Sequence, residues 1–189
     1  MTELYTKWVA AWGNAISIRV RRPENYSRNL TLRYPLTMLL DGEAVRITLD
    51  NFCGTESVTL THASVARSLE GSGIDGETVL PLTFGGAAHV TIPAGERVQS
   101  DPAAFPVKRG EKIAISLNFA DFTELRSAVN ITGPLSSGYF AVGDFADSAV
   151  LPMDVSNKTN WFYFLSDVDV LTSADKHCVI CYGDSITAQ

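Results

Sequence analysis

The residues of this 189-residue chain that are best placed for chemistry lie close to its C-terminal end. Ser185 follows Gly183 and Asp184, and these three come directly after the apolar run Cys178–Tyr182. A serine at the turn after a strand is placed like a nucleophile, but it needs a neighbouring base to become reactive. His177 lies eight residues earlier, which in an extended chain is roughly 20 Å or more, against a hydrogen-bond reach of about 3 Å. We therefore expect His177 not to activate Ser185.

Cysteines and histidines elsewhere suggest sites that we interpret structurally. Cys178 and Cys181 have no second pair to complete a metal site, and residues three apart on a strand point to opposite faces. We predict that both are buried structural thiols. His62 and His89 lie on predicted strands or loops, and we expect them to make ordinary hydrogen bonds.

Two pairs of aspartates raise the question of a metal or paired-carboxylate site. Asp167 and Asp169 share one face of a predicted strand, but no third ligand is near them in sequence. Asp144 and Asp147 invite the same suggestion. We interpret both pairs as solvated polar surface, and we expect the protein to use no metal and no cofactor.

Composition and charge exclude two classes of partner. The formal net charge is -6 and no basic run is longer than Arg21-Arg22, so we expect no surface that follows nucleic-acid phosphates. The apolar stretch near the N-terminus is interrupted by Lys7, Trp12 and Gly13, which fits neither a signal peptide nor a membrane span. Three unevenly spaced cysteines predict a cytoplasmic protein without a disulfide framework.

Alternation with a period of two dominates residues 30–120 and predicts antiparallel strands. Val45, Ile47 and Leu49 fall on one face of such a strand and polar residues fall on the other, as in a half-buried sheet. Residues 113–119 alternate between large apolar and small or polar side chains in the same way. Several short strands at this spacing indicate an all-β, antiparallel β-sandwich of jelly-roll type.

Two local patterns refine this organisation. Asp41-Gly42 separates two strand-like runs and predicts a hairpin with a type I′ turn. After Thr172 a polar stretch leads into residues 178–183, a continuously apolar run typical of a strand in a parallel sheet. We therefore expect a β-sandwich domain over residues 1–172. Residues 173–189 are then a linker with a vestigial first strand and turn of an α/β, flavodoxin-like domain.

Gly183-Asp184-Ser185-Ile186, at the end of that apolar run, resembles the first signature block of the SGNH (GDSL-type) esterase and lipase superfamily. Upstream segments support the resemblance, because they occur in the order seen in bacterial members that carry an N-terminal β-sandwich before the hydrolase domain. These segments are "WVAAWGNA", "PLTFGG", "VTIPAGERVQSDP" and "FLSDVDVL". The resemblance covers nearly the whole chain.

The resemblance implies a role for three residues. Ser185 is the expected nucleophile toward an ester carbonyl, and its backbone N–H is one oxyanion donor. Gly183 and Asp184 organise the turn, since the triad carboxylate of the family belongs to a later D-x-x-H block. That block and the other oxyanion donors are expected beyond Gln189, and neither His62 nor any other histidine here has the D-x-x-H spacing.

The whole protein is accordingly expected to be a serine esterase without metal. Its expected substrate is an acyl or acetyl ester on a carbohydrate or other small molecule. The 189-residue chain by itself is expected to be catalytically incomplete, with a C-terminal hydrolase domain as its missing partner. An uncovered apolar strand over residues 177–183 is expected to lie against the sandwich or to pair with a second copy of the chain.

A competing hypothesis is a stand-alone carbohydrate- or protein-binding β-sandwich. Trp8, Trp12 and Trp161 have rings that suit stacking against a sugar, as such a module would require. Packing in the core or between the sheets is the interpretation that we favour for them. Substrate and ligand identity are not fixed by fold-level resemblance.

Overall fold

The computed structural model describes residues 5–18, 26–131, 137–152 and 157–183. Within these ranges no helix is long and apolar enough to cross a membrane. One short 3-10 helix is present, η1 (Gly76–Thr78). The strands are β1 (Tyr5–Gly13), β2 (Ser17–Ile18), β3 (Tyr26–Ser27), β4 (Leu30–Thr37), β5 (Ala44–Asp50), β6 (Val58–Arg67), β7 (Leu80–Pro81), β8 (Val90–Ile92), β9 (Arg97–Gln99), β10 (Lys112–Phe119), β11 (Thr123–Glu124), β12 (Ser127–Asn130), β13 (Gly138–Val142), β14 (Lys158–Thr159), β15 (Trp161–Tyr163) and β16 (Leu165–Ser173).

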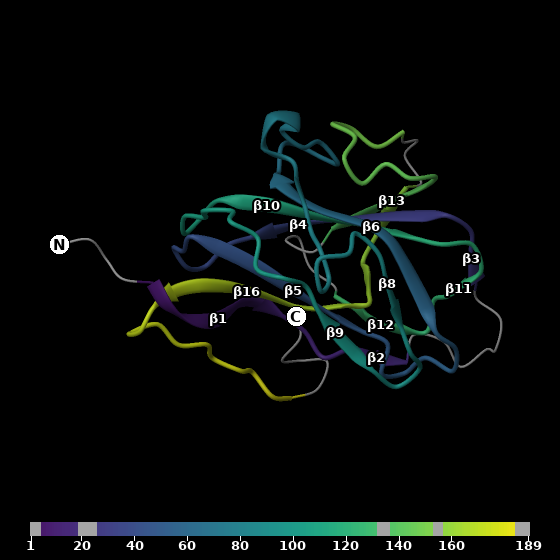
Figure 1. The fold of residues 1–189 in the computed structure, drawn as a ribbon, viewed down its shortest axis with the longest axis horizontal. Coiled ribbons are helices and arrows are strands. Elements are labelled where there is room, and N and C mark those ends of the chain that lie inside the picture. Colours follow the sequence, from purple (N-terminus) through teal and green to yellow (C-terminus); the bar gives the residue numbers. More distant parts are fainter. Residues whose placement is uncertain (1–4, 19–25, 132–136, 153–156, 184–189) are drawn as a thin grey trace.

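Two antiparallel sheets form the two layers of the molecule (Figure 1). One has the order β1-β16-β5-β9, and the other has the order β14-β13-β4-β10-β6-β7, with β8 also paired to β6. Two further sheets have the orders β11-β3 and β15-β12-β2, and isolated antiparallel bridges such as Gly42 with Val107 add to the pairing. Every pairing in these ranges is antiparallel, so the prediction of an all-β antiparallel sandwich is confirmed.

The core lies between the two large sheets and is built from alternating strand positions. Val45, Ile47 and Leu49 of β5 are fully buried, as their spacing predicted. The facing sheet contributes the odd-numbered positions of β10, together with the ring of Tyr34, which stacks on Phe162 at 4.6 Å between centroids. Burying each such large apolar side chain stabilises the fold by roughly 1.5–3 kcal/mol.

The predicted hairpin at Asp41-Gly42 is wrong. β4 and β5, which flank it, belong to different sheets, so the chain crosses from one layer to the other here. Gly42 is buried and does not adopt a positive φ angle. A Cβ atom on it would lie 2.1 Å from Val170 Cγ1 and 2.5 Å from the Leu171 carbonyl oxygen. Glycine is therefore needed here for close approach to β16, not for a type I′ turn.

The alternation in β10 predicted that this strand is buried on one face only. In the structure, its outer face is buried as well. Ser116 and Asn118 are as deeply buried as the core positions of the same strand. Two loops, residues 68–79 and residues 143–151, lie above this face in Figure 1 and bond to it. The sheet is therefore covered on both sides, and its outer face holds a buried polar layer.

Candidate functional site

The expected nucleophile Ser185 and its neighbour Asp184 lie outside the described residues. Gly183, the third residue of that turn, is exposed. The strand expected over residues 177–183 is not formed, because no described strand lies beside it to pair with its backbone. Near its start, the Lys7 ammonium donates to the Lys176 carbonyl oxygen at 2.9 Å and lies 3.3 Å from Nδ1 of His177.

Side chains of this segment are uncovered. The exposed fractions of Val179, Ile180 and Tyr182 are 86%, 85% and 100%. Cys178 and Cys181 are free and exposed, so the prediction of buried thiols is wrong: the strand that was expected to bury them does not form within this chain. Val179, Ile180 and Tyr182 therefore belong to an exposed apolar stretch.

His62 belongs to a cluster that sequence reasoning missed. Its Nδ1 lies 3.1 Å from Asp144 Oδ2, and its Nε2 lies 3.1 Å from Asp147 Oδ2. The two aspartates thus attach the 143–151 loop to β6 and are not simply solvated. They bind opposite ring nitrogens, so the three side chains do not converge on one point, and no metal-binding group of three such residues occurs in the described ranges. His89 is exposed in the loop before β8.

Asp167 and Asp169 lie on the outer face of β16, on one side as predicted. Asp169 pairs with Arg46 across the strands at 2.9 Å. Asp167 accepts a hydrogen bond from the Ser166 hydroxyl at 2.8 Å, and burial raises the pKa of its carboxyl group. Both carboxylates are therefore partly buried. The prediction that they form solvated polar surface is only partly correct.

The three tryptophans do not assemble into a sugar-stacking platform. Trp12 packs on Phe162 with 5.3 Å between ring centroids, and Trp161 packs against the core. Trp8 lies on the outer face of the four-stranded sheet, where the guanidinium carbon of Arg46 lies 4.4 Å from the centroid of its ring. Packing, the favoured interpretation, holds for Trp12 and Trp161.

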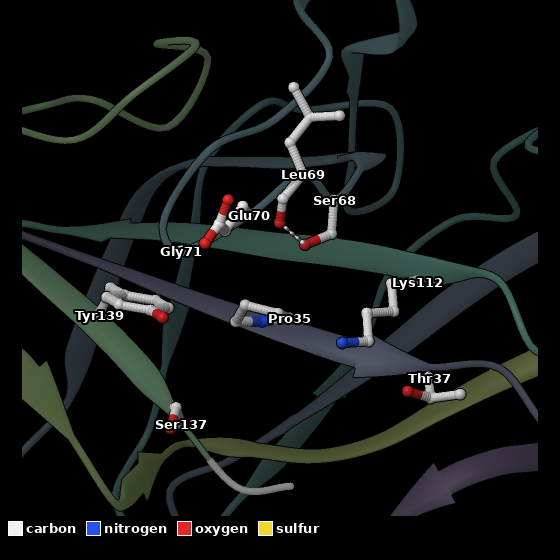
Figure 2. A pocket seen from close by; sticks show the side chains of 9 residues that line it. All are labelled: Pro35, Thr37, Ser68, Leu69, Glu70, Gly71, Lys112, Ser137 and Tyr139. Atoms are coloured by element: carbon white, nitrogen blue, oxygen red, sulfur yellow. Dashed lines mark hydrogen bonds between the residues drawn. The ribbon is translucent and has the colours of Figure 1, made fainter.

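A groove lies on the outer face of the larger sheet (Figure 2). Its volume is about 250 Å³. Strands β4, β10 and β13 form the floor, and the loop after β6 forms the wall. The lining residues are Pro35, Thr37, Ser68, Leu69, Glu70, Gly71, Lys112, Ser137 and Tyr139.

The groove lies where pairing between β4 and β13 stops. Tyr139 is paired with Arg33, but β13 begins at Gly138, so its pairing ends before it reaches Pro35. Proline has no N–H to donate to a neighbouring strand. The absence of that donor at Pro35 leaves the sheet open at this place, and the open position becomes the floor of the groove.

The wall of the groove is a tight loop anchored to the sheet. The Leu69 N–H donates to the Gly73 carbonyl oxygen at 2.8 Å, and Gly71 at the tip has a φ angle of 65°. Glycine adopts this left-handed conformation without a steric penalty. Arg33, which lies in β4 beneath this loop, donates through Nη1 to the Ser72 carbonyl oxygen at 2.7 Å. The wall is thereby fixed to β4.

Arg33 is fully buried and bonds to both covering loops. Besides Ser72, it donates to the Ser116 hydroxyl at 2.9 Å. Three carbonyl oxygens of the other loop also accept from it, those of Phe145, Ala146 and Ser148 at 2.9, 3.2 and 2.8 Å. Burial lowers the pKa of Arg33 to about 10, while the charge of Asp147 acts to raise it. The group is therefore charged at neutral pH and holds both loops.

Polar groups of different strands converge in the groove. The Tyr139 side chain is almost fully buried, at 7% exposed, and its hydroxyl points toward Pro35 (Figure 2). The Lys112 ammonium points toward Pro35 from the other side, and the Glu70 carboxylate lies on the wall. These three groups have no hydrogen-bond partner within the described parts of the chain. The Tyr139 hydroxyl is not among the buried polar atoms that lack a partner, so it is open to the groove and a water or ligand atom can reach it.

Sequence reasoning did not find this groove. Glu70, Lys112 and Tyr139 come from three segments that are far apart along the chain, and no spacing pattern links them. The register of β4 with β10 and β13 brings Lys112 and Tyr139 together, and the pairing of β6 with β10 places the loop that carries Glu70 beside them.

Comparisons with known proteins give no family. No protein-family model matches the chain, and no curated protein matches it. One solved structure with a similar fold contains the cysteine protease and lectin-like domains of Cwp84, a surface layer associated protein of Clostridium difficile. The match has 9% sequence identity and a TM-score of 0.44, and it covers 78% of this chain. The chain spans 33% of that structure.

Proposed function

We propose that this chain is a non-catalytic β-sandwich module that binds one unit of a carbohydrate in the groove between β13 and the 68–73 loop. The observation that carries this proposal is the convergence of the Tyr139 hydroxyl and the Lys112 ammonium over Pro35. A polyhydroxy ligand offers oxygen atoms to both donors and hydroxyl hydrogens to Glu70. The volume of about 250 Å³ lies below the 300–1,000 Å³ that is usual for drug-sized ligands, which favours a single small unit.

Tyr139→Phe is expected to weaken binding of a monosaccharide about three- to tenfold. The substitution removes one neutral hydrogen-bond donor, worth about 0.5–1.5 kcal/mol, and keeps the ring packing. NMR titration with a methyl glycoside measures the affinity and locates the site through the shifts of residues around the groove.

The matched control is Tyr182→Phe, which removes a hydroxyl from the fully exposed segment. The control should bind like the wild type. Equal affinities in wild type and Tyr139→Phe, or shifts confined to another face of the sandwich, would contradict the proposal.

A second candidate function is that of an accessory domain beside a serine ester hydrolase. The uncovered side chains of Val179, Ile180 and Tyr182, directly before Gly183, favour it. Covering apolar surface is worth roughly 25 cal/mol per Å², so a neighbouring domain gains by burying this segment. On this proposal Ser185 is the nucleophile of that neighbouring domain, and the sandwich holds the ester substrate or borders its site.

The test compares the turnover of a chromogenic short-chain ester by the native gene product and by its Ser185→Ala variant. Losing the nucleophile of a serine hydrolase lowers turnover on the order of a millionfold. The wild-type product should therefore be active and the variant inactive, while residues 1–189 alone should be inactive. Equal turnover in both products argues against a role for Ser185, and turnover by residues 1–189 alone argues against an accessory role.

A further inference from the structure

Lys112, the first residue of β10, makes no ion pair with any described residue, unlike Arg46 of β5 and Arg67 at the end of β6. Arg46 pairs with Asp169 at 2.9 Å, and Arg67 pairs with Glu111 at 2.8 Å. The Lys112 ammonium has no carboxylate partner in the ranges that the structure describes. It is instead directed along the floor of the groove toward Pro35 (Figure 2).

Tyr139 supplies a second donor to the same place. Its ring is held by the apolar cluster with Ala141 and Leu151, so the hydroxyl is fixed at the end of a rigid side chain. A carboxylate accepts hydrogen bonds at two oxygens, and charge-assisted hydrogen bonds are roughly twice as strong as neutral ones. The Lys112 ammonium therefore suits a ligand carboxylate, and the Tyr139 hydroxyl offers a further donor on the other side of Pro35.

Glu70 sets the orientation of such a ligand. It lies on the wall formed by the 68–73 loop, whereas Lys112 and Tyr139 lie on the strands of the floor (Figure 2). A ligand carboxylate is repelled by Glu70 and attracted by Lys112, so it faces the floor. Ring hydroxyls of the same ligand then point toward the wall and donate to Glu70 and to the hydroxyl of Ser68.

We infer that the groove is selective for an acidic sugar, a uronic acid unit whose carboxylate binds to Lys112. This inference rests on the proposed carbohydrate-binding function and narrows it to one class of ligand. Because the site is open to solvent, the ion pair is screened by salt. We expect about a tenfold preference for the acidic sugar at low ionic strength and a smaller preference at high salt.

The experiment titrates the 189-residue chain with methyl β-D-glucuronide and with methyl β-D-glucoside, which differ only in the carboxylate. Wild type should bind the glucuronide about tenfold more tightly, and Lys112→Met should bind the two equally. Lys108→Met, which removes an exposed lysine outside the groove, should keep the preference. Thermal unfolding of each variant confirms that it is folded.

The outcomes separate the two proposals. Equal binding of both glycosides by wild type overturns the selectivity and leaves the carbohydrate-binding function in place. A preference that survives in Lys112→Met also overturns the selectivity, because the carboxylate then binds elsewhere. If neither glycoside binds at millimolar concentration, both the selectivity and the proposed function are wrong.

Discussion

Arg33→Met should lower the free energy of unfolding by about 3–5 kcal/mol, the range found when one partner of a buried charged network is removed. Methionine fills most of the space but donates nothing. The Ser116 hydroxyl and the carbonyl oxygens of Ser72, Phe145 and Ser148 would lose a buried donor together. Each unsatisfied buried group costs about 1–3 kcal/mol. Urea unfolding, followed by tryptophan fluorescence, measures the change.

The control for this variant is Arg109→Met, at an exposed loop position. Substitutions at such positions usually change stability by no more than about 0.5 kcal/mol. If Arg33→Met and Arg109→Met have the same urea midpoint and slope, the buried network does not stabilise the covering loops. Hydrogen exchange should also show that the amides of residues 68–74 and 143–151 lose protection first in Arg33→Met.

Gly42→Ala is expected to destabilise the protein by about 3 kcal/mol, at the upper end of the usual cost of overpacking. The added methyl group would meet a side-chain carbon of Val170 at 2.1 Å and the Leu171 carbonyl oxygen at 2.5 Å. The side chain of Val170 has a fixed place in the core, and the carbonyl belongs to the backbone of β16, so neither can move without cost. For a domain of this size the melting temperature should fall by about 6–12 °C.

Gly76→Ala is the matched control for Gly42→Ala. A Cβ atom at Gly76 meets nothing within 4 Å, and its φ angle is not positive. The control should be neutral or slightly stabilising, because alanine restricts the unfolded chain more than glycine does. A melting temperature of Gly42→Ala equal to that of Gly76→Ala would show that β16 can move away from this crossing.

Strand positions and their buried faces were predictable from local pattern, because alternation reports which side of a strand faces apolar surroundings. Val45, Ile47 and Leu49 are buried as expected. Which strands are neighbours was not predictable in the same way. Asp41-Gly42 has the composition of a hairpin turn, but the chain crosses between sheets there, because β4 pairs with β10 and β13 and β5 pairs with β16.

The candidate site was not predictable because it depends on non-local contacts. Arg33 sits in β4 between Leu32 and Tyr34, and nothing in its neighbourhood along the chain indicates the two loops that it holds. Likewise, the apolar run before Gly183 has the composition of a buried strand. Composition alone does not supply the neighbouring strand that such a segment requires.

The pairing of β1 with β16 has a consequence for synthesis of the protein. Tyr5 lies opposite Ser173, so the first and last strands of the sandwich are neighbours. Among the described strands β1 pairs with β16 alone, so during translation it has no partner until β16 has left the ribosome. β16 also pairs with β5, so one edge of β5 stays open until then. Long-range pairing of this kind slows folding, and open strand edges favour aggregation until the pairing is complete. We therefore expect the nascent chain to depend on chaperones until β16 pairs with β1 and β5 and completes the four-stranded sheet.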